Sequence, residues 1–106
     1  SLLLYNEVVE NGFDSHHFIA GLSSHYRNLL VCKNPKSMDL LEVPDAIKEK
    51  YIKQAKVIDV KIIMRALNAL SKTDVSYKSS KNQRLLVEVC LMELCSLKQE
   101  QEKKKP

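Results

Sequence analysis

Three histidines and three cysteines are the residues of this sequence most able to do chemistry. His17 and His25 stand eight positions apart, about two turns on one helix face. Metal ligands on a helix normally recur at three or four positions and need a third ligand, and only Asp14 stands near enough. We therefore expect His16 and His17 to be surface residues of a first helical turn, His25 to be half-buried, and no metal to be bound.

The cysteines do not predict a reactive or metal-binding site. Cys32, Cys90 and Cys95 are an odd number and contain no C-x-x-C, so neither a disulfide framework nor a zinc module is indicated. Cys90 and Cys95 lie among Leu and Val, where burial suppresses thiol reactivity. With two glycines in the chain, a glycine-rich phosphate loop is excluded. We expect no catalytic residue and no cofactor, and the free thiols indicate a reducing compartment.

Glu88 is the charged residue that most needs a partner, because it stands between Val87 and Val89 in an apolar stretch. A carboxylate buried without a partner costs several kcal/mol or becomes protonated. Arg84 is one helical turn before it, and Arg27 could reach it from an earlier helix. The pattern predicts a structural ion pair of Glu88 with Arg84 and Arg27. A catalytic role would require a second acid or a cleft, which the sequence does not indicate.

Helices must position these side chains. The 106 residues include only 2 Gly and 3 Pro, which disfavours a many-stranded sandwich or barrel, and the length suits one domain with one core. Apolar periodicity predicts an all-α, five-helix bundle with helices at about 2–10, 15–33, 44–56, 60–70 and 81–99. We assign residues 1–99 to the helical domain and 100–106 to a charged tail.

Several local expectations follow from capping and periodicity. Asp14 and Asp59 should cap the second and fourth helices, and Ser80 should form a capping box with Gln83, with Asn82 as a rival cap. Residues 36–43 should form a loop in which Leu40 and Leu41 pack down. The buried stripe of the third helix is predicted to consist of Ala46, Ile47, Tyr51, Ile52 and Ala55, and that of the fourth helix of Ile63, Ala66, Leu67 and Leu70.

The first and last helices have unusual patterns. Residues 2–10 begin an apolar helix with no capping residue except Ser1, so we expect the chain to be a piece of a longer protein. The last helix carries apolar residues around nearly its whole circumference, which a surface helix would not do. Either it is the central helix of the bundle, or part of its surface meets another protein chain.

Charge and hydropathy exclude two further classes of function. Lys103, Lys104 and Lys105 supply most of the net charge of +4, so the folded body is nearly neutral. No apolar stretch approaches the ~20 residues that span a bilayer, and no membrane association is expected. The alternative that remains open is a small helical nucleic-acid-binding domain with a phosphate-contacting surface of Lys48, Lys50, Lys53, Lys56 and Lys61. Acidic residues interrupt this set, so strong direct DNA binding is not expected.

Two blocks of sequence carry a family resemblance. The first contains Gly12-Phe13-Asp14, then Phe18, Leu22 and the run from His25 to Leu30; the second runs from Tyr77 to Leu85 and continues through Val87-Glu88 to Leu91. In this order they resemble the third domain of the gamma/tau subunit of bacterial DNA polymerase III. The two blocks stand near the two ends of the chain, whereas residues 38–70 fit only through their helical pattern and Leu40-Leu41-Glu42-Val43.

The resemblance implies a role in assembly. Domains of this family form the helical collar of the clamp loader, in which gamma/tau copies join delta and delta-prime subunits in a five-membered ring for DNA replication. The ATP site and the zinc module of such a subunit belong to its other domains, so this chain would have no enzyme activity of its own. The resemblance also implies a cytoplasmic, bacterial location. Ring contacts are heterologous, and we expect Leu91, Met92, Leu94 and Cys95 to lie at the subunit interface, with Phe18 and Leu22 packed internally.

Overall fold

The structure, a computed structural model, describes residues 15–103 apart from the side chain of Pro35. Over this range the chain forms four α-helices and one 3-10 helix, with no strand among the described residues, which confirms the all-α class. The elements are α2 (Ser15–Val31), η1 (Pro35–Leu40), α3 (Asp45–Val57), α4 (Val60–Ser76) and α5 (Gln83–Lys103). The helix predicted at 2–10 and the Asp14 cap lie outside the described residues.

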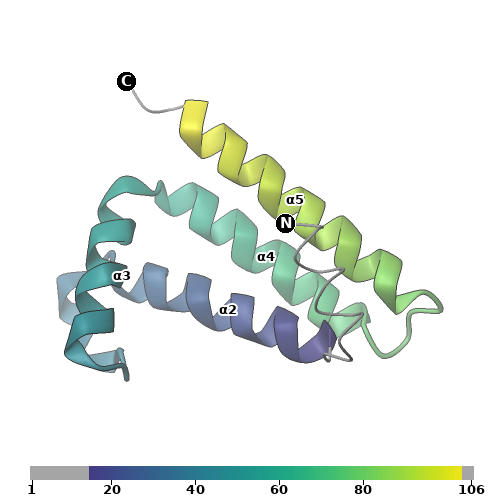
Figure 1. The fold of residues 1–106 in the computed structure, drawn as a ribbon, viewed down its shortest axis with the longest axis horizontal. Coiled ribbons are helices and arrows are strands. Elements are labelled where there is room, and N and C mark those ends of the chain that lie inside the picture. The colour runs from purple at the N-terminus through teal and green to yellow at the C-terminus, as the bar shows by residue number, and fades with distance from the viewer. Residues whose placement is uncertain (1–14, 104–106) are drawn as a thin grey trace.

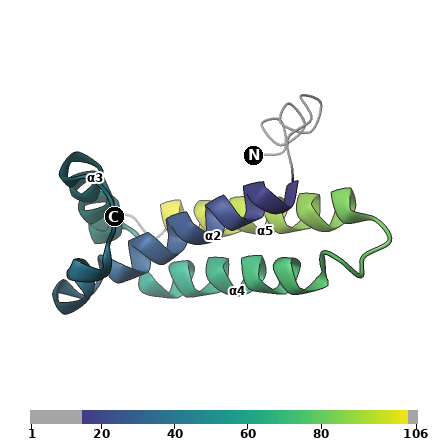
Figure 2. The ribbon, with the colours of Figure 1, turned by 90° about the horizontal axis from the view of Figure 1, so that it is seen from below.

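Three long helices run along one another, and a shorter one crosses their end. Consecutive long helices are antiparallel, α2 to α4 and α4 to α5, while α3 lies across the end where α2 finishes (Figure 1). In Figure 2, α2 and α5 both lie on the same side of α4, with α2 in front of α5. The helix contacts agree, since α4 packs extensively on both α2 and α5, whereas α2 and α5 touch little. The central helix is therefore α4.

The residue types of α4 explain its central place. Ile63, Ala66 and Leu70 recur at helical spacing and are almost wholly buried. Ile63 belongs to a cluster with α2 and α3, and Ala66 and Leu70 to a second cluster that includes Ile19 of α2 and Val87 of α5. Leu67 packs against the first cluster as a partly buried side chain. The predicted stripe of this helix is confirmed, and it faces both neighbouring helices.

Side-chain caps fix where the helices begin. Asp59 Oδ1 accepts from the Lys61 amide at 2.8 Å, which confirms the predicted cap of α4. At the start of α5, Asn82 Oδ1 accepts from the Leu85 amide at 3.0 Å. Asn82 is therefore the cap, while Ser80 Oγ accepts from the Asn82 amide, so the capping box predicted for Ser80 and Gln83 is not formed. These bonds satisfy amides that the first helical turn leaves without partners.

The segment predicted as a loop at 36–43 contains a short helix instead. Asn34 Oδ1 accepts from the Lys36 amide at 3.0 Å, and Pro35 stands in the first turn, where its fixed φ and missing amide hydrogen are tolerated. Leu41 is buried as predicted, but Leu40 is 62% exposed. Only one of the two leucines can face the core because they are consecutive.

The stripe predicted for α3 is only partly correct. Ala55 is buried and Tyr51 and Ile52 are partly buried, but Ala46 and Ile47 are exposed. The reason is the crossing position of α3, which packs on the bundle through its second half and leaves its first turn in solvent.

The last two helices are longer than their sequence pattern indicates. Helix α4 continues to Ser76, where Thr73 is buried and its hydroxyl donates to the Ala69 carbonyl at 3.0 Å. Helix α5 continues to Lys103, beyond the end predicted at 99. Gln101, in the segment assigned to a charged tail, accepts from the Asp59 amide at 2.7 Å and donates to the Val57 carbonyl at 3.0 Å. None of the described helices is long and apolar enough to cross a bilayer.

Truncating the centre of α4 should destabilise the whole bundle. Leu70 has no exposed surface, and Leu70→Ala is expected to lower the free energy of unfolding by about 2–5 kcal/mol, because it leaves a cavity between α2 and α5. The matched control is Val75→Ala on the same helix, where the side chain is 80% exposed and the expected loss is below about 0.5 kcal/mol. Urea unfolding measures both, and equal losses would contradict this description of the core.

Candidate interaction surface on the last helix

Helix α5 has apolar side chains on two opposite faces, and only one of them is covered. Its inward face packs on the bundle through Val87, Cys90, Leu91, Leu94 and Leu97. On the opposite face, Leu85 is 52% exposed and Val89 and Met92 are each 48% exposed. These three residues, which we call the outer stripe, recur at i, i+4 and i+7 and therefore form one row.

The sequence allowed two interpretations of this helix: the central helix of the bundle, or a helix with part of its surface against another chain. The structure rules out the central position. Helix α5 is not enclosed by the others, because it lies at the edge of the bundle, packed mainly on α4 (Figures 1 and 2). Its apolar circumference therefore results from a core face together with an exposed face.

The four residues predicted at a subunit interface occupy three different environments. Met92 belongs to the outer stripe and Cys95 is half-buried, but Leu91 and Leu94 are buried in the domain's own core. Successive residues of a helix point about 100° apart, so these four residues do not share one face of α5. Leu91 and Leu94 are core residues that reach a surface only at the edge of a groove.

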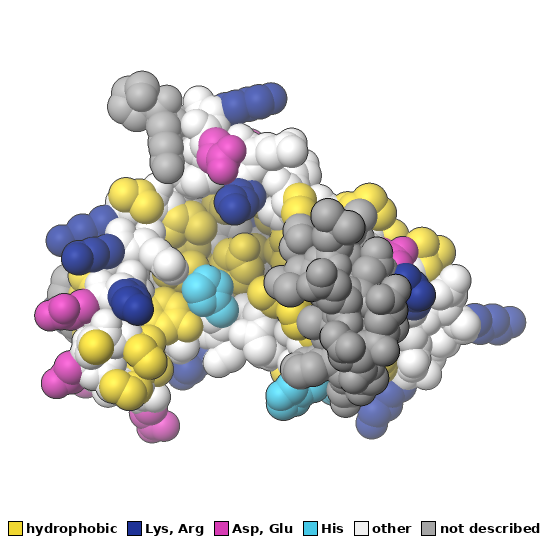
Figure 3. Space-filling view, in the orientation of Figure 1, with side chains coloured by type: hydrophobic (Ala, Val, Ile, Leu, Met, Phe, Trp, Pro, Cys, Tyr) yellow, Lys and Arg dark blue, Asp and Glu magenta, His cyan; other side chains and the backbone are white. Residues whose placement is uncertain are grey.

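That groove lies between α2 and α5 and has a volume of about 220 Å³. Its lining is almost wholly apolar, with one lysine: Phe18, Leu22, Tyr26, Leu91, Leu94, Cys95 and Lys98. Figure 3 shows hydrophobic side chains on the floor of the hollow between these helices. The sequence did not reveal this α2–α5 groove. Phe18 and Leu22 pack against the core cluster as predicted, but they are only partly buried and also line the groove. Periodicity identifies the face of each helix but not the gap between two of them.

Glu88 has one of the two predicted partners. Arg84 Nε donates to Glu88 Oε1 at 2.9 Å, and the carboxylate side chain is 26% exposed. Arg27 is not in the ion pairs that the structure describes. It lies on α2 and lines a different hollow together with Leu40 and Glu42. A partly exposed pair one helical turn apart contributes only about 0.3–0.5 kcal/mol. It therefore gives little stability.

The histidines lie apart from one another. His16 Nε2 lies 2.6 Å from Asp74 Oδ1, and its ring packs on Tyr77 with centroids 5.0 Å apart. His25 Nδ1 lies 3.3 Å from the Tyr51 hydroxyl oxygen, and burial lowers the pKa of this imidazole. His25 is half-buried as expected. No group of three metal-binding side chains occurs within residues 15–103.

The cysteines are free thiols in apolar surroundings. Cys32 and Cys90 are buried and Cys95 is half-buried. Burial raises the pKa of the Cys32 and Cys90 thiols, and Cys90 Sγ also lies 3.8 Å from the Ala69 carbonyl oxygen. A raised thiol pKa opposes nucleophilic reactivity at neutral pH, so Cys32 and Cys90 act as core residues.

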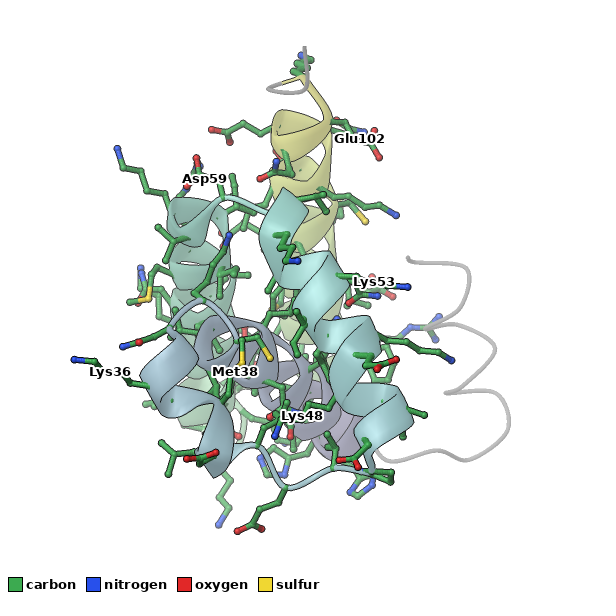
Figure 4. All side chains as sticks on the ribbon, turned by 90° about the vertical axis from the view of Figure 1, so that its left-hand side faces the viewer. Lys36, Met38, Lys48, Lys53, Asp59 and Glu102 are labelled. Atoms are coloured by element: carbon green, nitrogen blue, oxygen red, sulfur yellow. The ribbon has the colours of Figure 1, made fainter. Side chains whose placement is uncertain are left out.

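The lysines of the nucleic-acid alternative differ in their exposure to solvent. Lys48 is partly buried near Cys32, whereas Lys50 and Lys53 are exposed. Figure 4 shows Lys48 and Lys53 extending from α3 in different directions. Lys56 and Lys61 are exposed as well, so the nucleic-acid-binding alternative stays a prediction.

Comparisons with known proteins add no assignment. No protein family model matches this chain, and neither a curated protein nor a solved structure is significantly similar to it.

The His25 contact predicts an acid-sensitive stability. Because the folded state disfavours protonation of this imidazole, its stabilising effect is complete above the ordinary pKa near 6.5 and is lost as the pH falls below that value. We expect His25→Gln to reduce the loss of melting temperature between pH 7.5 and about pH 5. The control is His17→Gln, which removes an exposed histidine of the same helix. An unchanged acid-induced loss in His25→Gln would contradict the prediction.

Proposed function

We propose that this domain is the oligomerisation, or collar, domain of a gamma/tau-type clamp-loader subunit of a bacterial DNA polymerase III. In this role it binds other gamma/tau copies together with delta and delta-prime subunits, and it holds the ATP-driven sliding-clamp loader together during DNA replication. The domain itself catalyses no reaction. ATP and zinc are bound by other domains of such a subunit, and the location is the bacterial cytoplasm.

The outer stripe is the observation that carries this proposal. Leu85, Val89 and Met92 form a row that faces away from the core, at the edge of the bundle. Removing apolar surface from water is favourable by about 25 cal/mol per Å², so a row of this kind favours contact with a second apolar surface. A helix that served only its own bundle would carry polar residues there.

The chemistry of the other candidate residues is consistent with an assembly role. The Glu88 carboxylate is paired with Arg84, and the Cys90 thiol is buried among apolar neighbours. In the described part of the chain, no nucleophile, base and orienting group converge in the way that nucleophilic catalysis requires. The sequence resemblance to a clamp-loader collar adds the identity of the partners, which the geometry does not supply.

A charge in the outer stripe should weaken association without unfolding the domain. We expect Met92→Asp to lower the weight-average sedimentation coefficient at high protein concentration, because it places a carboxylate in an apolar contact. Its melting temperature should change by only a few degrees, since Met92 is 48% exposed and lies outside the core clusters. Sedimentation velocity over a concentration series measures the effect, for the domain alone and mixed with delta-type subunits.

Met64→Asp is the matched control, because Met64 is 52% exposed but lies on α4. It should sediment as the wild type does. Equal sedimentation of Met92→Asp and the wild type at every concentration, alone and in the mixture, would overturn the proposed function.

A further inference from the structure

We propose that the outer stripe of one copy docks into the α2–α5 groove of a second copy, in a head-to-tail contact. This inference rests on the proposed function and specifies which two surfaces meet. The inference gives the groove a role in the same assembly, as the surface that receives the outer stripe of a neighbouring copy.

The outer stripe lies on α5, and α5 also forms one side of the groove, but the two surfaces face different directions. Met92 in the outer stripe and Leu91 at the groove are adjacent in sequence, so their side chains leave α5 about 100° apart. A copy therefore cannot place its own stripe in its own groove. One copy can, however, offer its stripe to one neighbour and its groove to another, which defines a heterologous contact.

The shapes of the two surfaces match. The outer stripe is a single ridge of side chains at i, i+4 and i+7, and the groove is a depression of about 220 Å³ with an apolar lining. Helices pack by inserting ridges into grooves, so stripe against groove buries more surface than stripe against stripe. Leu22, Leu91 and Leu94 are among the residues that line the groove, and their aliphatic side chains suit a Met or Leu side chain.

The charges at the edges of the two surfaces are opposite. Among the described residues, Lys98 is the one charged residue that lines the groove. On the other surface, Glu93 is exposed and follows Met92 directly, and Glu88 stands one turn before Met92. A neighbour that inserts its stripe can thus bring Glu93 towards Lys98.

The size of the contact predicts weak pairwise binding. Three half-exposed side chains cover much less than the ~800 Å² per partner of a standard interface. In a closed ring, however, each copy makes two such contacts, and closure makes the last contact intramolecular. A single contact between two isolated domains should therefore have a low affinity.

A mixing experiment tests the head-to-tail arrangement. The stripe variant is Met92→Asp, and the groove variant is Leu22→Glu, which places a charge in the wall of the groove. Each variant alone lacks one of the two surfaces of every contact, so neither should associate. A one-to-one mixture retains one intact pair, the stripe of the groove variant with the groove of the stripe variant. It should sediment as a dimer that goes no further.

Other results would overturn the inference while leaving the proposed function intact. If Leu22→Glu alone associates as the wild type does while Met92→Asp does not, the stripe binds another surface. The same holds if the mixture shows no dimer although the wild type associates. If Leu22→Glu melts much lower than the wild type and still associates, the groove is filled from within its own chain. A wild type that never associates, alone or with delta-type subunits, would overturn the proposed function as well.

A charge swap keeps the inference testable if Leu22→Glu fails to fold. Lys98 and Glu93 are both exposed, so Lys98→Glu and Glu93→Lys should fold normally, as far-ultraviolet circular dichroism can check. Each single variant should weaken association by about threefold to tenfold, and the double variant should recover most of the loss. Additive weakening in the double variant, or no effect of either single variant, would overturn the proposed pairing.

Discussion

The structure depends on one constraint, which is that α5 carries apolar residues on two opposite faces while its own bundle can cover only one. The inward face, with Val87 and Leu94, completes the core around α4. The outward face, with Leu85, Val89 and Met92, stays about half exposed. Its cost in free energy is offset when a second surface covers it. The proposed assembly role rests on this unequal coverage.

The rest of the fold holds α5 firmly in that position. Helix α4 packs on both α2 and α5, and Leu70, which is fully buried, lies in the cluster that joins the three helices. At the far end, Gln101 bonds to the backbone of the turn between α3 and α4, and Arg65 Nη1 donates to both carboxylate oxygens of Glu100, at 2.8 and 2.9 Å. In Figure 4, Asp59 and Glu102 lie at this same end. At the start of α5, Gln83 Nε2 donates to the carbonyl of Tyr77, the residue that caps the end of α4, at 3.0 Å, so both ends of the helix are bonded to its neighbours.

The α-helices, the Asp59 cap and the ion pair of Arg84 with Glu88 were predictable from the sequence because they depend on near neighbours. The position of α5 in the bundle was not predictable. The apolar pattern of α5 would be the same in a central helix as in a helix at the edge of the bundle with one face covered by another chain. In the structure α4 is the central helix, so α5 lies at the edge. Leu91 and Leu94 were assigned to an interface for the same reason. The groove depends on the spacing between α2 and α5, and no local pattern encodes that spacing.

Oxidative footprinting of the methionines tests the central claim most directly. Met92 and Met64 have nearly equal exposure, 48% and 52%, but only Met92 lies in the outer stripe. In dilute protein both thioethers should be oxidised at similar rates by a hydroxyl-radical source. As protein concentration rises, or as delta-type subunits are added, Met92 should become protected while Met64 does not. Equal oxidation of the two residues under all of these conditions would contradict the account.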